Sequence, residues 1–107
     1  MKRGEIYWVD LNPTIGSEIN KLRPCVIISA TPINRARRTV VVIPLSTKAK
    51  AVPPLTLKVS CLGKDVVAIC DQIRTIDKKR LKKSVGVFSQ VNMDSLEKGL
   101  KQVLALS

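Results

Sequence analysis

Histidine is absent from this sequence of 107 residues. Its absence excludes catalytic schemes built on imidazole, such as Ser-His-Asp and Cys-His arrangements, and removes the commonest protein ligand of metal ions. Acid–base chemistry must therefore use other side chains. No group of Cys, Asp and Glu with metal-ligand spacing takes its place, so we expect no metal and no other cofactor.

Cysteine is scarce. The chain has three, Cys25, Cys61 and Cys70, widely spaced and each within an apolar run. An odd number at such spacing fits neither a disulfide framework nor a metal knuckle, and buried free thiols are the better interpretation. A catalytic nucleophile is the alternative role for one of these cysteines, but the chain has no histidine to activate the thiol.

Long hydrophobic runs are also missing. No apolar stretch approaches the roughly 18–20 residues of a transmembrane helix, and the opening Met1 to Glu5 leads into polar sequence without a secretory signal. We therefore expect a cytoplasmic protein that does not contact a membrane. With 45% apolar residues the chain can fill one small core, so residues 1–107 are predicted to form a single domain.

Short apolar runs rich in β-branched residues recur along the chain and predict strands at 6–11, 25–29, 39–44, 55–61, 66–70 and 85–89. In the fourth run, apolar side chains alternate with polar ones, which is typical of an antiparallel strand with one buried face. The turn sequence at 62–65 predicts a hairpin with the fifth run.

The C-terminal segment has helical spacing instead. Asn92 is a plausible N-cap with Asp94 in the first turn, Gly99 weakens the helix a little, and the apolar positions are Met93, Leu96, Leu100 and Val103. Several strands and one helix predict a mainly β (α+β) fold, a strongly bent antiparallel sheet or partial barrel with a helix packed on it. Two long polar connections, 12–22 and 46–54, are where a functional site is expected.

Positive charge dominates, with nineteen Lys and Arg against eight Asp and Glu and a net charge of +11. A run of cations is often only a solvated face, but this excess favours a polyanion, with nucleic acid first and a membrane surface second. Only Tyr7, Trp8 and Phe88 are aromatic, so a platform of several stacked bases has little support.

Four blocks of sequence carry a family pattern. They are Arg3 to Thr14 (RGEIYWVDLNPT), Gly16-Ser17-Glu18 with Arg23-Pro24, Asn34-Arg35 with Ile43 to Thr47 (IPLST), and Asp71 to Asp77 (DQIRTID). In this order and spacing they resemble the MazF/PemK family of bacterial toxin endoribonucleases, over nearly the whole chain. The resemblance implies a CcdB/MazF-like fold, in which a twisted antiparallel sheet closes toward an SH3-like partial barrel with short helices and a C-terminal helix.

The resemblance also implies an activity and partners. Members of the family are toxins of toxin–antitoxin systems that cleave single-stranded RNA, commonly mRNA at a short sequence, without a metal ion, leaving a 2′,3′-cyclic phosphate and a 5′-hydroxyl. They assemble as homodimers and are bound by a cognate acidic, MazE-like antitoxin. Internal attack by a ribose 2′-hydroxyl needs no metal-activated water, which fits the missing metal ligands.

Two residues match the family's catalytic positions. Arg23 offers a fork of donors suited to phosphate oxygens, and the family adds a role in proton transfer, although a guanidinium is a poor general base. Ser46 stands where the family has Thr and can still donate to a non-bridging oxygen, but it lacks the methyl group that restricts the Thr rotamer. From composition alone, Arg23 would be a surface charge and Ser46 a turn residue.

Further candidates for catalysis or RNA binding come from the same blocks: Glu18, Asn34, Thr47, Asp71 and Gln72. The plainer interpretation is that Glu18 is an exposed acid of a loop and that Asp71 and Gln72 hold a turn. Some PemK-type relatives have Arg where this chain has Ile69, which puts their Arg-Asp mechanism in doubt here. Ile19 replaces a frequent Gln and Lys21 a frequent Gly.

Three functions follow from these observations. The leading one is a sequence-selective endoribonuclease toxin. The alternatives are a CcdB-like toxin that inhibits gyrase without cleaving RNA, against which Arg23 and the hydroxyl of Ser46 argue, and a basic nucleic-acid-binding module whose catalysis is weakened by Ser46.

Overall fold

The computed structural model describes residues 1–106. Seven strands, two α-helices and two short 3-10 segments follow one another in the order β1 Glu5–Asp10, β2 Leu22–Ile27, α1 Thr31–Ala36, β3 Thr39–Ser46, β4 Thr56–Cys61, β5 Lys64–Ile69, η1 Cys70–Gln72, β6 Arg74–Asp77, η2 Lys78–Arg80, β7 Leu81–Val87 and α2 Gln90–Val103.

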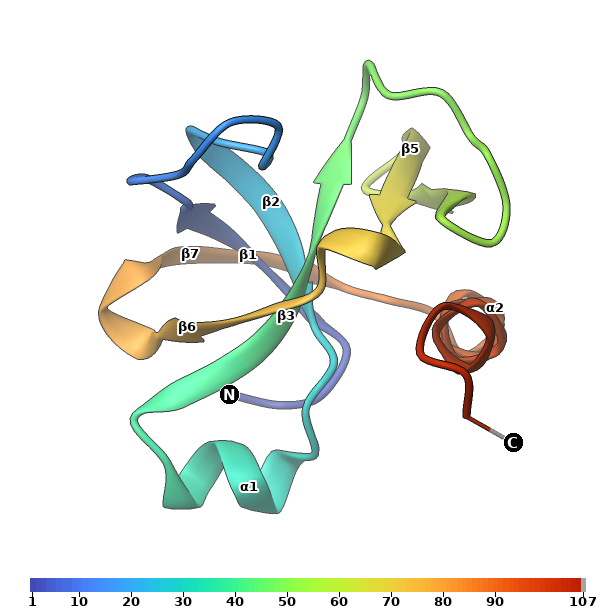
Figure 1. The fold of residues 1–107 in the computed structure, drawn as a ribbon. Helices are drawn as coiled ribbons and strands as arrows, with labels where there is room; N and C mark the ends of the chain where they lie inside the picture. Colours follow the sequence, from blue (N-terminus) through green and yellow to red (C-terminus); the bar gives the residue numbers. More distant parts are fainter. Residues whose placement is uncertain (107) are drawn as a thin grey trace.

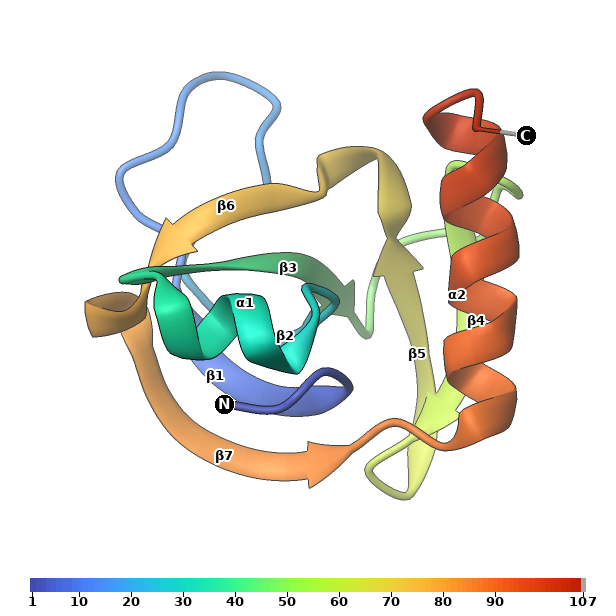
Figure 2. The same cartoon turned by 90° about the horizontal axis from the view of Figure 1, so that it is seen from below.

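The strands form one strongly curved antiparallel sheet in the order β4-β5-β3-β2-β1-β7, with β6 paired to the first half of β3. In Figure 2 the sheet curls round on itself, β6 and β7 lie on opposite sides of the view, and α2 stands alongside β4. The predicted mainly β fold with a C-terminal helix is therefore confirmed, as a partial barrel that is not closed.

Strand β3 is the hub of this sheet. Its first half pairs with β6, its middle with β2, and its last residues with β5, where Ser46 stands opposite Val67. Because neighbours cover it on both edges, β3 is an almost continuous apolar run whose residues 42–46 are all buried. Ser46 thus ends a rigid strand, at the upper tip of β3 in Figure 1.

The predicted hairpin between β4 and β5 is confirmed. Cys61 pairs with Lys64, which leaves a two-residue turn in which Leu62 and Gly63 have φ values of 55° and 75°. Two consecutive positive φ values match the twist of antiparallel strands, and they explain Gly at the second position. The tip of the hairpin packs against Gly86 of β7, where an added Cβ would lie 2.7 Å from Cδ2 of Leu62.

Helix α2 begins earlier than predicted. Ser89 is the N-cap, with its Oγ accepting a hydrogen bond from the Asn92 amide, and the Asn92 side chain instead donates to the Ser60 carbonyl of β4. Asp94 lies beyond the first turn, where it accepts from Gln90. Gly99 permits close packing, because a Cβ there would lie 2.6 Å from Cδ1 of Leu57.

Two apolar clusters lie on the two sides of the sheet. One is covered by α2 and includes Ile6, Val26 and Leu96, and the other fills the curl of the sheet and includes Val9, Ile27 and Val42. Successive side chains on β1 and β2 point to opposite faces, so each strand contributes to both clusters. No helix within residues 1–106 is long and apolar enough to cross a membrane.

All six predicted strands are present, with shifted ends. The largest shift is in β7, predicted at 85–89 and found at Leu81–Val87, because its polar start pairs with β1 through Val9–Leu81 and Trp8–Lys83. Helix α1 and strand β6 were not predicted. Both are short, and β6 buries only Ile76, so its strand conformation comes from pairing with β3.

Candidate functional site

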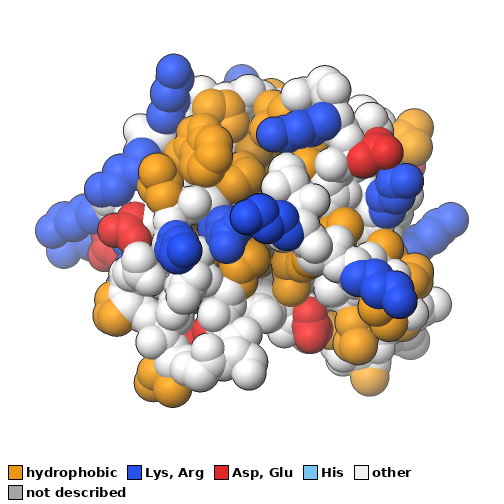
Figure 3. Space-filling model, turned by 90° about the horizontal axis from the view of Figure 1, so that it is seen from above, with side chains coloured by type: hydrophobic (Ala, Val, Ile, Leu, Met, Phe, Trp, Pro, Cys, Tyr) orange, Lys and Arg blue, Asp and Glu red, His pale blue; other side chains and the backbone are white. Residues whose placement is uncertain are grey.

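The two principal candidates meet at one pocket. Arg23 and Ser46 line a cavity of about 190 Å³ together with Thr47. The remaining walls come from the same two strands, from β1 and from the β4–β5 hairpin, and are mainly apolar: Trp8, Leu22, Pro24, Leu45, Leu62, Lys64 and Val66. Figure 3 looks onto the end of the molecule where β3 stops, and it shows apolar side chains gathered beside several Lys and Arg side chains.

Ser46 is held in place by the turn that follows it. Its side chain is 7% exposed, and its Oγ accepts hydrogen bonds from the backbone N–H groups of Lys48 at 3.2 Å and Ala49 at 3.1 Å. A hydroxyl has two acceptor sites and one proton, so both acceptor sites are used and the proton remains to be donated. These two bonds orient Oγ without the methyl group of Thr, in contrast to the looser hydroxyl that the sequence suggested.

Arg23 is half-buried on β2, opposite Val9 of β1. Its Nε donates to the carbonyl of Asn20 at 3.1 Å, which ties the guanidinium to the end of the loop over residues 11–21. Within residues 1–106 its two terminal amino groups form no hydrogen bond or ion pair. They are the donors available for a phosphate in the pocket.

Two polar or aromatic residues of this pocket, Lys64 and Trp8, were not predicted as site residues. Lys64 begins β5 directly after the tight turn at Leu62 and Gly63, so the hairpin prediction could have singled it out. Among the residues that line the pocket there is no carboxylate, whereas Arg23 and Lys64 bring two positive charges. The site therefore suits an anion with an apolar part.

Glu18, Asp71 and Gln72 lie at a separate depression of about 370 Å³, between the loop over 11–21 and η1. Gln72 joins these two segments, because its Oε1 accepts from the Ile19 amide at 2.6 Å and its Nε2 donates to the Ser17 carbonyl at 3.5 Å. Glu18 accepts from the Ile15 amide at 2.6 Å and so stabilises its own loop. These three candidates thus lie at a different depression from Arg23, Ser46 and Thr47.

Asn34 is not at either depression. It is 1% exposed in α1, and its side chain accepts from Ser29 and donates to the carbonyls of Met1 at 3.2 Å and Ser29 at 3.0 Å. All these partners belong to the fold, which favours a structural role for Asn34 over the predicted contact with RNA. The residue connects the N-terminus to α1 instead.

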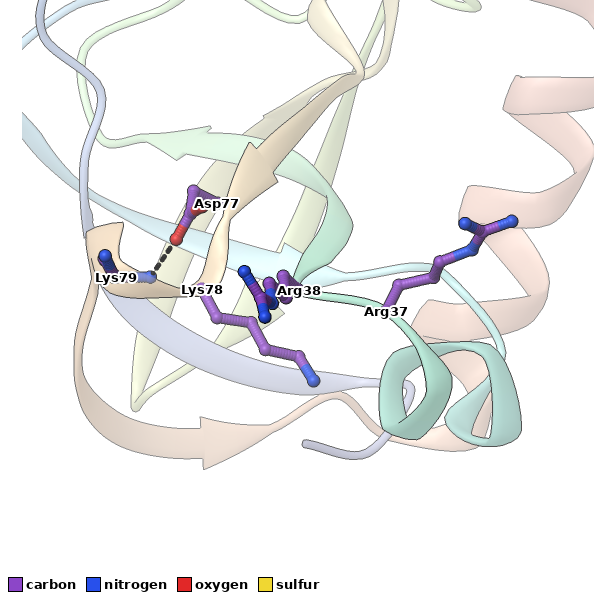
Figure 4. A pocket seen from close by; sticks show the side chains of 5 residues that line it. All are labelled: Arg37, Arg38, Asp77, Lys78 and Lys79. Carbon is purple, nitrogen blue, oxygen red and sulfur yellow. Dashed lines mark hydrogen bonds between the residues drawn. The ribbon is translucent and has the colours of Figure 1, made fainter.

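A basic cleft of about 330 Å³ lies at the far end of β3 from Ser46, lined by Arg37, Arg38, Asp77, Lys78 and Lys79. Figure 4 shows the Asp77 carboxylate turned to the backbone of Lys79, with which it forms a 2.8 Å hydrogen bond. Lys78 donates to the Asn34 carbonyl. In the described part of the chain, the side chains of Arg37 and Arg38 are engaged in neither hydrogen bonds nor ion pairs.

The cysteines are free, as predicted. Cys25 and Cys70 are buried and Cys61 is half-buried. Burial raises the pKa of the Cys25 thiol to about 12 and that of Cys70 to about 11, which keeps both protonated and unreactive near neutral pH. Over residues 1–106, no three metal-ligating side chains of His, Cys, Asp or Glu gather at one place.

Comparison with known proteins decides the family. A family model described as PemK-like, MazF-like toxin of type II toxin-antitoxin system matches residues 2–104. The chain belongs to this toxin family. It is 36% identical over 115 residues to Endoribonuclease MazF9 of Mycobacterium tuberculosis (strain ATCC 25618 / H37Rv), with 99% of this chain and 98% of that relative covered. The family resemblance of the four sequence blocks is thereby confirmed.

Solved structures agree on the fold of the family. MazF from Deinococcus radiodurans superposes with a TM-score of 0.88 at 20% identity, covering 98% of this chain and 96% of that one. An endoribonuclease in complex with its cognate antitoxin from a mycobacterial species gives a TM-score of 0.83 at 23% identity, covering 100% and 97%. The partial barrel described above is thus the MazF fold.

Proposed function

We propose that this protein is a cytoplasmic toxin whose residues 1–107 act as one endoribonuclease domain on single-stranded RNA. The observation that carries the proposal is the convergence of Arg23 and Ser46 on one pocket, in a chain that belongs to the MazF-like toxins. Its relative at 36% identity is named an endoribonuclease. A guanidinium fork and a donating hydroxyl are groups that recognise a phosphate.

The proposed reaction is an internal transfer at phosphorus. The ribose 2′-oxygen attacks the adjacent phosphorus and passes its proton to water, the bond from phosphorus to the 5′-oxygen breaks, and that oxygen gains a proton from an acid of the pocket. The products are a 2′,3′-cyclic phosphate and a 5′-hydroxyl. The Ser46 hydroxyl donates to a non-bridging oxygen, and the terminal amino groups of Arg23 balance the charge that develops on the phosphorane.

Lys64 is the other cation of the pocket and is the group we assign to the departing 5′-oxygen, to which an ammonium can give a proton. Thr47 is exposed beside Ser46 and supports binding of the neighbouring phosphate. Glu18 and Asp71 border the second depression, where we propose that they contact RNA outside the cleaved bond. Gln72 acts by holding the loop that carries Asn20.

Incubation of the purified protein with a long RNA in EDTA tests this function. We expect cleavage at a short recurring sequence, with ends that carry a 2′,3′-cyclic phosphate and a 5′-hydroxyl. Ser46→Ala purified in parallel is the control for contaminating ribonuclease. Loss of activity in EDTA or 3′-hydroxyl products would contradict the mechanism, and inhibition of gyrase without RNA cleavage would favour the CcdB-like alternative.

We also assign two protein partners. The first is a second copy of the chain, which can pack against exposed apolar side chains such as Val87 at 68% and Val91 at 74% exposure. The second is an acidic antitoxin segment, which is attracted to the same cationic surface as RNA. Sedimentation should therefore show a dimer at micromolar concentration, and antitoxin should displace RNA. Simultaneous binding of both without mutual weakening would contradict this assignment.

A further inference from the structure

Trp8 is the one tryptophan of the chain, and it lies at the pocket rather than in the core. Its side chain remains 37% exposed, whereas Ile6 and Val9 of the same strand are fully buried. The ladder between β1 and β7 shifts register on both sides of the segment that holds Trp8, between Ile6 and Tyr7 and between Trp8 and Val9. Bulges of this kind redirect side chains.

The pairing places Trp8 in a row across three strands. It stands opposite Pro24 of β2 on one side and opposite Lys83 of β7 on the other. Residues directly paired across strands point to the same face of a sheet. The row therefore runs from a proline ring next to Arg23, through the indole, to an exposed ammonium group.

We propose that Trp8 is the surface on which a nucleobase beside the cleaved phosphate stacks, and that Lys83 binds the next phosphate along the strand. This inference rests on the proposed RNA cleavage. A flat apolar indole flanked by cations matches a nucleotide, whose base has an aromatic face and whose phosphate is anionic. Stacking accepts any base, so Trp8 supplies affinity and position whereas other groups select the sequence.

The intrinsic fluorescence of the protein tests this directly, because every tryptophan signal comes from Trp8. The probe is a short RNA that spans a mapped cut site and carries a 2′-deoxy sugar at the attacking nucleotide, so the wild-type protein binds it without cleavage. We expect saturable quenching of the emission. An abasic nucleotide on one side of the cut should abolish the quenching and weaken binding by about 5- to 100-fold, the range for losing one stacked base.

Substitutions at Trp8 give a second readout. Trp8→Leu keeps an apolar side chain but removes the aromatic face, so KM should rise about tenfold with a smaller change in kcat, and Trp8→Phe should recover most of the loss. A purely structural role would not be rescued in this way. If Trp8→Leu does not fold, the abasic RNA still tests the wild-type protein.

Lys83→Gln has a matched control in Lys82→Gln, since both residues are exposed but Lys82 is the unpaired extra residue of the bulge, whereas Lys83 pairs with Trp8. Lys83→Gln should reduce the slope of log affinity against log salt by about 0.7, one phosphate contact, whereas Lys82→Gln should leave it unchanged.

Three outcomes would overturn the inference. Equal slopes for the two lysine variants contradict the role of Lys83. RNA that is bound and cleaved while the Trp8 emission stays constant contradicts stacking, and emission that depends only on protein concentration places Trp8 between two copies of the chain. An absence of any RNA cleavage by the wild-type protein would instead overturn the proposed function, and this inference with it.

Discussion

Arg23 and Ser46 occupy matching positions on neighbouring strands, each two residues beyond the Cys25–Pro44 pair that ends the ladder between β2 and β3. Past that pair β3 turns to β5, and Pro24 has no N–H to continue the ladder. The two strands separate, and the pocket occupies the gap. A strand pairing with fixed register thus brings together two donors that are far apart in the sequence.

Replacement of Ser46 tests the donated hydroxyl. Ser46→Ala should lower the single-turnover cleavage rate by about 10- to 1,000-fold, the scale of losing one oxyanion donor. It also removes the acceptor of two backbone N–H groups, so the free energy of unfolding should fall by about 1–3 kcal/mol. Ser46→Thr keeps the oxygen and should retain activity. A fully active Ser46→Ala together with an inactive Thr47→Ala would show that the assignment is off by one residue.

Replacement of Arg23 separates charge from geometry. Arg23→Ala should cost about 1,000-fold or more in rate, because it removes the charge and both terminal donors from the pocket. Arg23→Lys keeps the charge without the fork, so RNA affinity should recover more than the rate does. Arg37→Ala in the basic cleft is the control and should cleave at nearly the wild-type rate. Equal rates for Arg23→Ala and Arg37→Ala would exclude the assigned role.

The loop over residues 11–21 offers an indirect test of the site. Gln72→Leu removes both side-chain bonds to that loop, so amide exchange at Ile19 should become about tenfold faster. Asn20 follows Ile19 in the sequence, and its carbonyl accepts the hydrogen bond from Nε of Arg23. Loosening the loop should therefore lower the cleavage rate several-fold, while the melting temperature changes little. Gln102→Leu on α2 serves as the control. Unchanged exchange at Ile19 would argue against this attachment.

The excess of positive charge predicts a strong effect of salt. If RNA binding neutralises about five phosphates, affinity should fall about a hundredfold between 50 and 200 mM salt, with a log–log slope of about −0.7 for each phosphate. An oligonucleotide analogue with an uncharged backbone should bind weakly and show little dependence on salt. A flat dependence for the natural RNA would show that the net charge of +11 does not drive binding.

The buried thiols predict an alkaline loss of stability. The unfolded chain releases the Cys25 proton near pH 9, whereas the folded chain holds it until about pH 12. Between these values the unfolded state binds fewer protons, so stability is complete below pH 9 and declines above it, by about 1.4 kcal/mol per pH unit for each such thiol. Denaturant unfolding from pH 8 to 10.5 measures the decline. Cys25→Ala should make it shallower than Cys61→Ala does, and equal slopes would contradict this account.

Much of the fold follows from local sequence. Alternation at 55–61 predicts β4, the turn sequence at 62–65 predicts the hairpin, and the apolar spacing after Asn92 predicts α2, which begins slightly earlier. Strand β6 and the start of β7 were missed because both are largely polar. They are strands because Thr39–Val42 and β1 supply hydrogen-bonding partners from distant parts of the chain.

The sequence by itself determined the family, the antiparallel β class, the excess of positive charge and the identity of Arg23 and Ser46 as a pair to examine. These depend on residue types and spacing along the chain. Only the tertiary structure decided that Asn34 is buried, that Glu18 and Gln72 lie apart from Arg23, and that Trp8 and Lys64 join the pocket. The reason is physical. A pocket forms where separate strands diverge, and its composition depends on pairing register, bulges and turns that no local pattern contains.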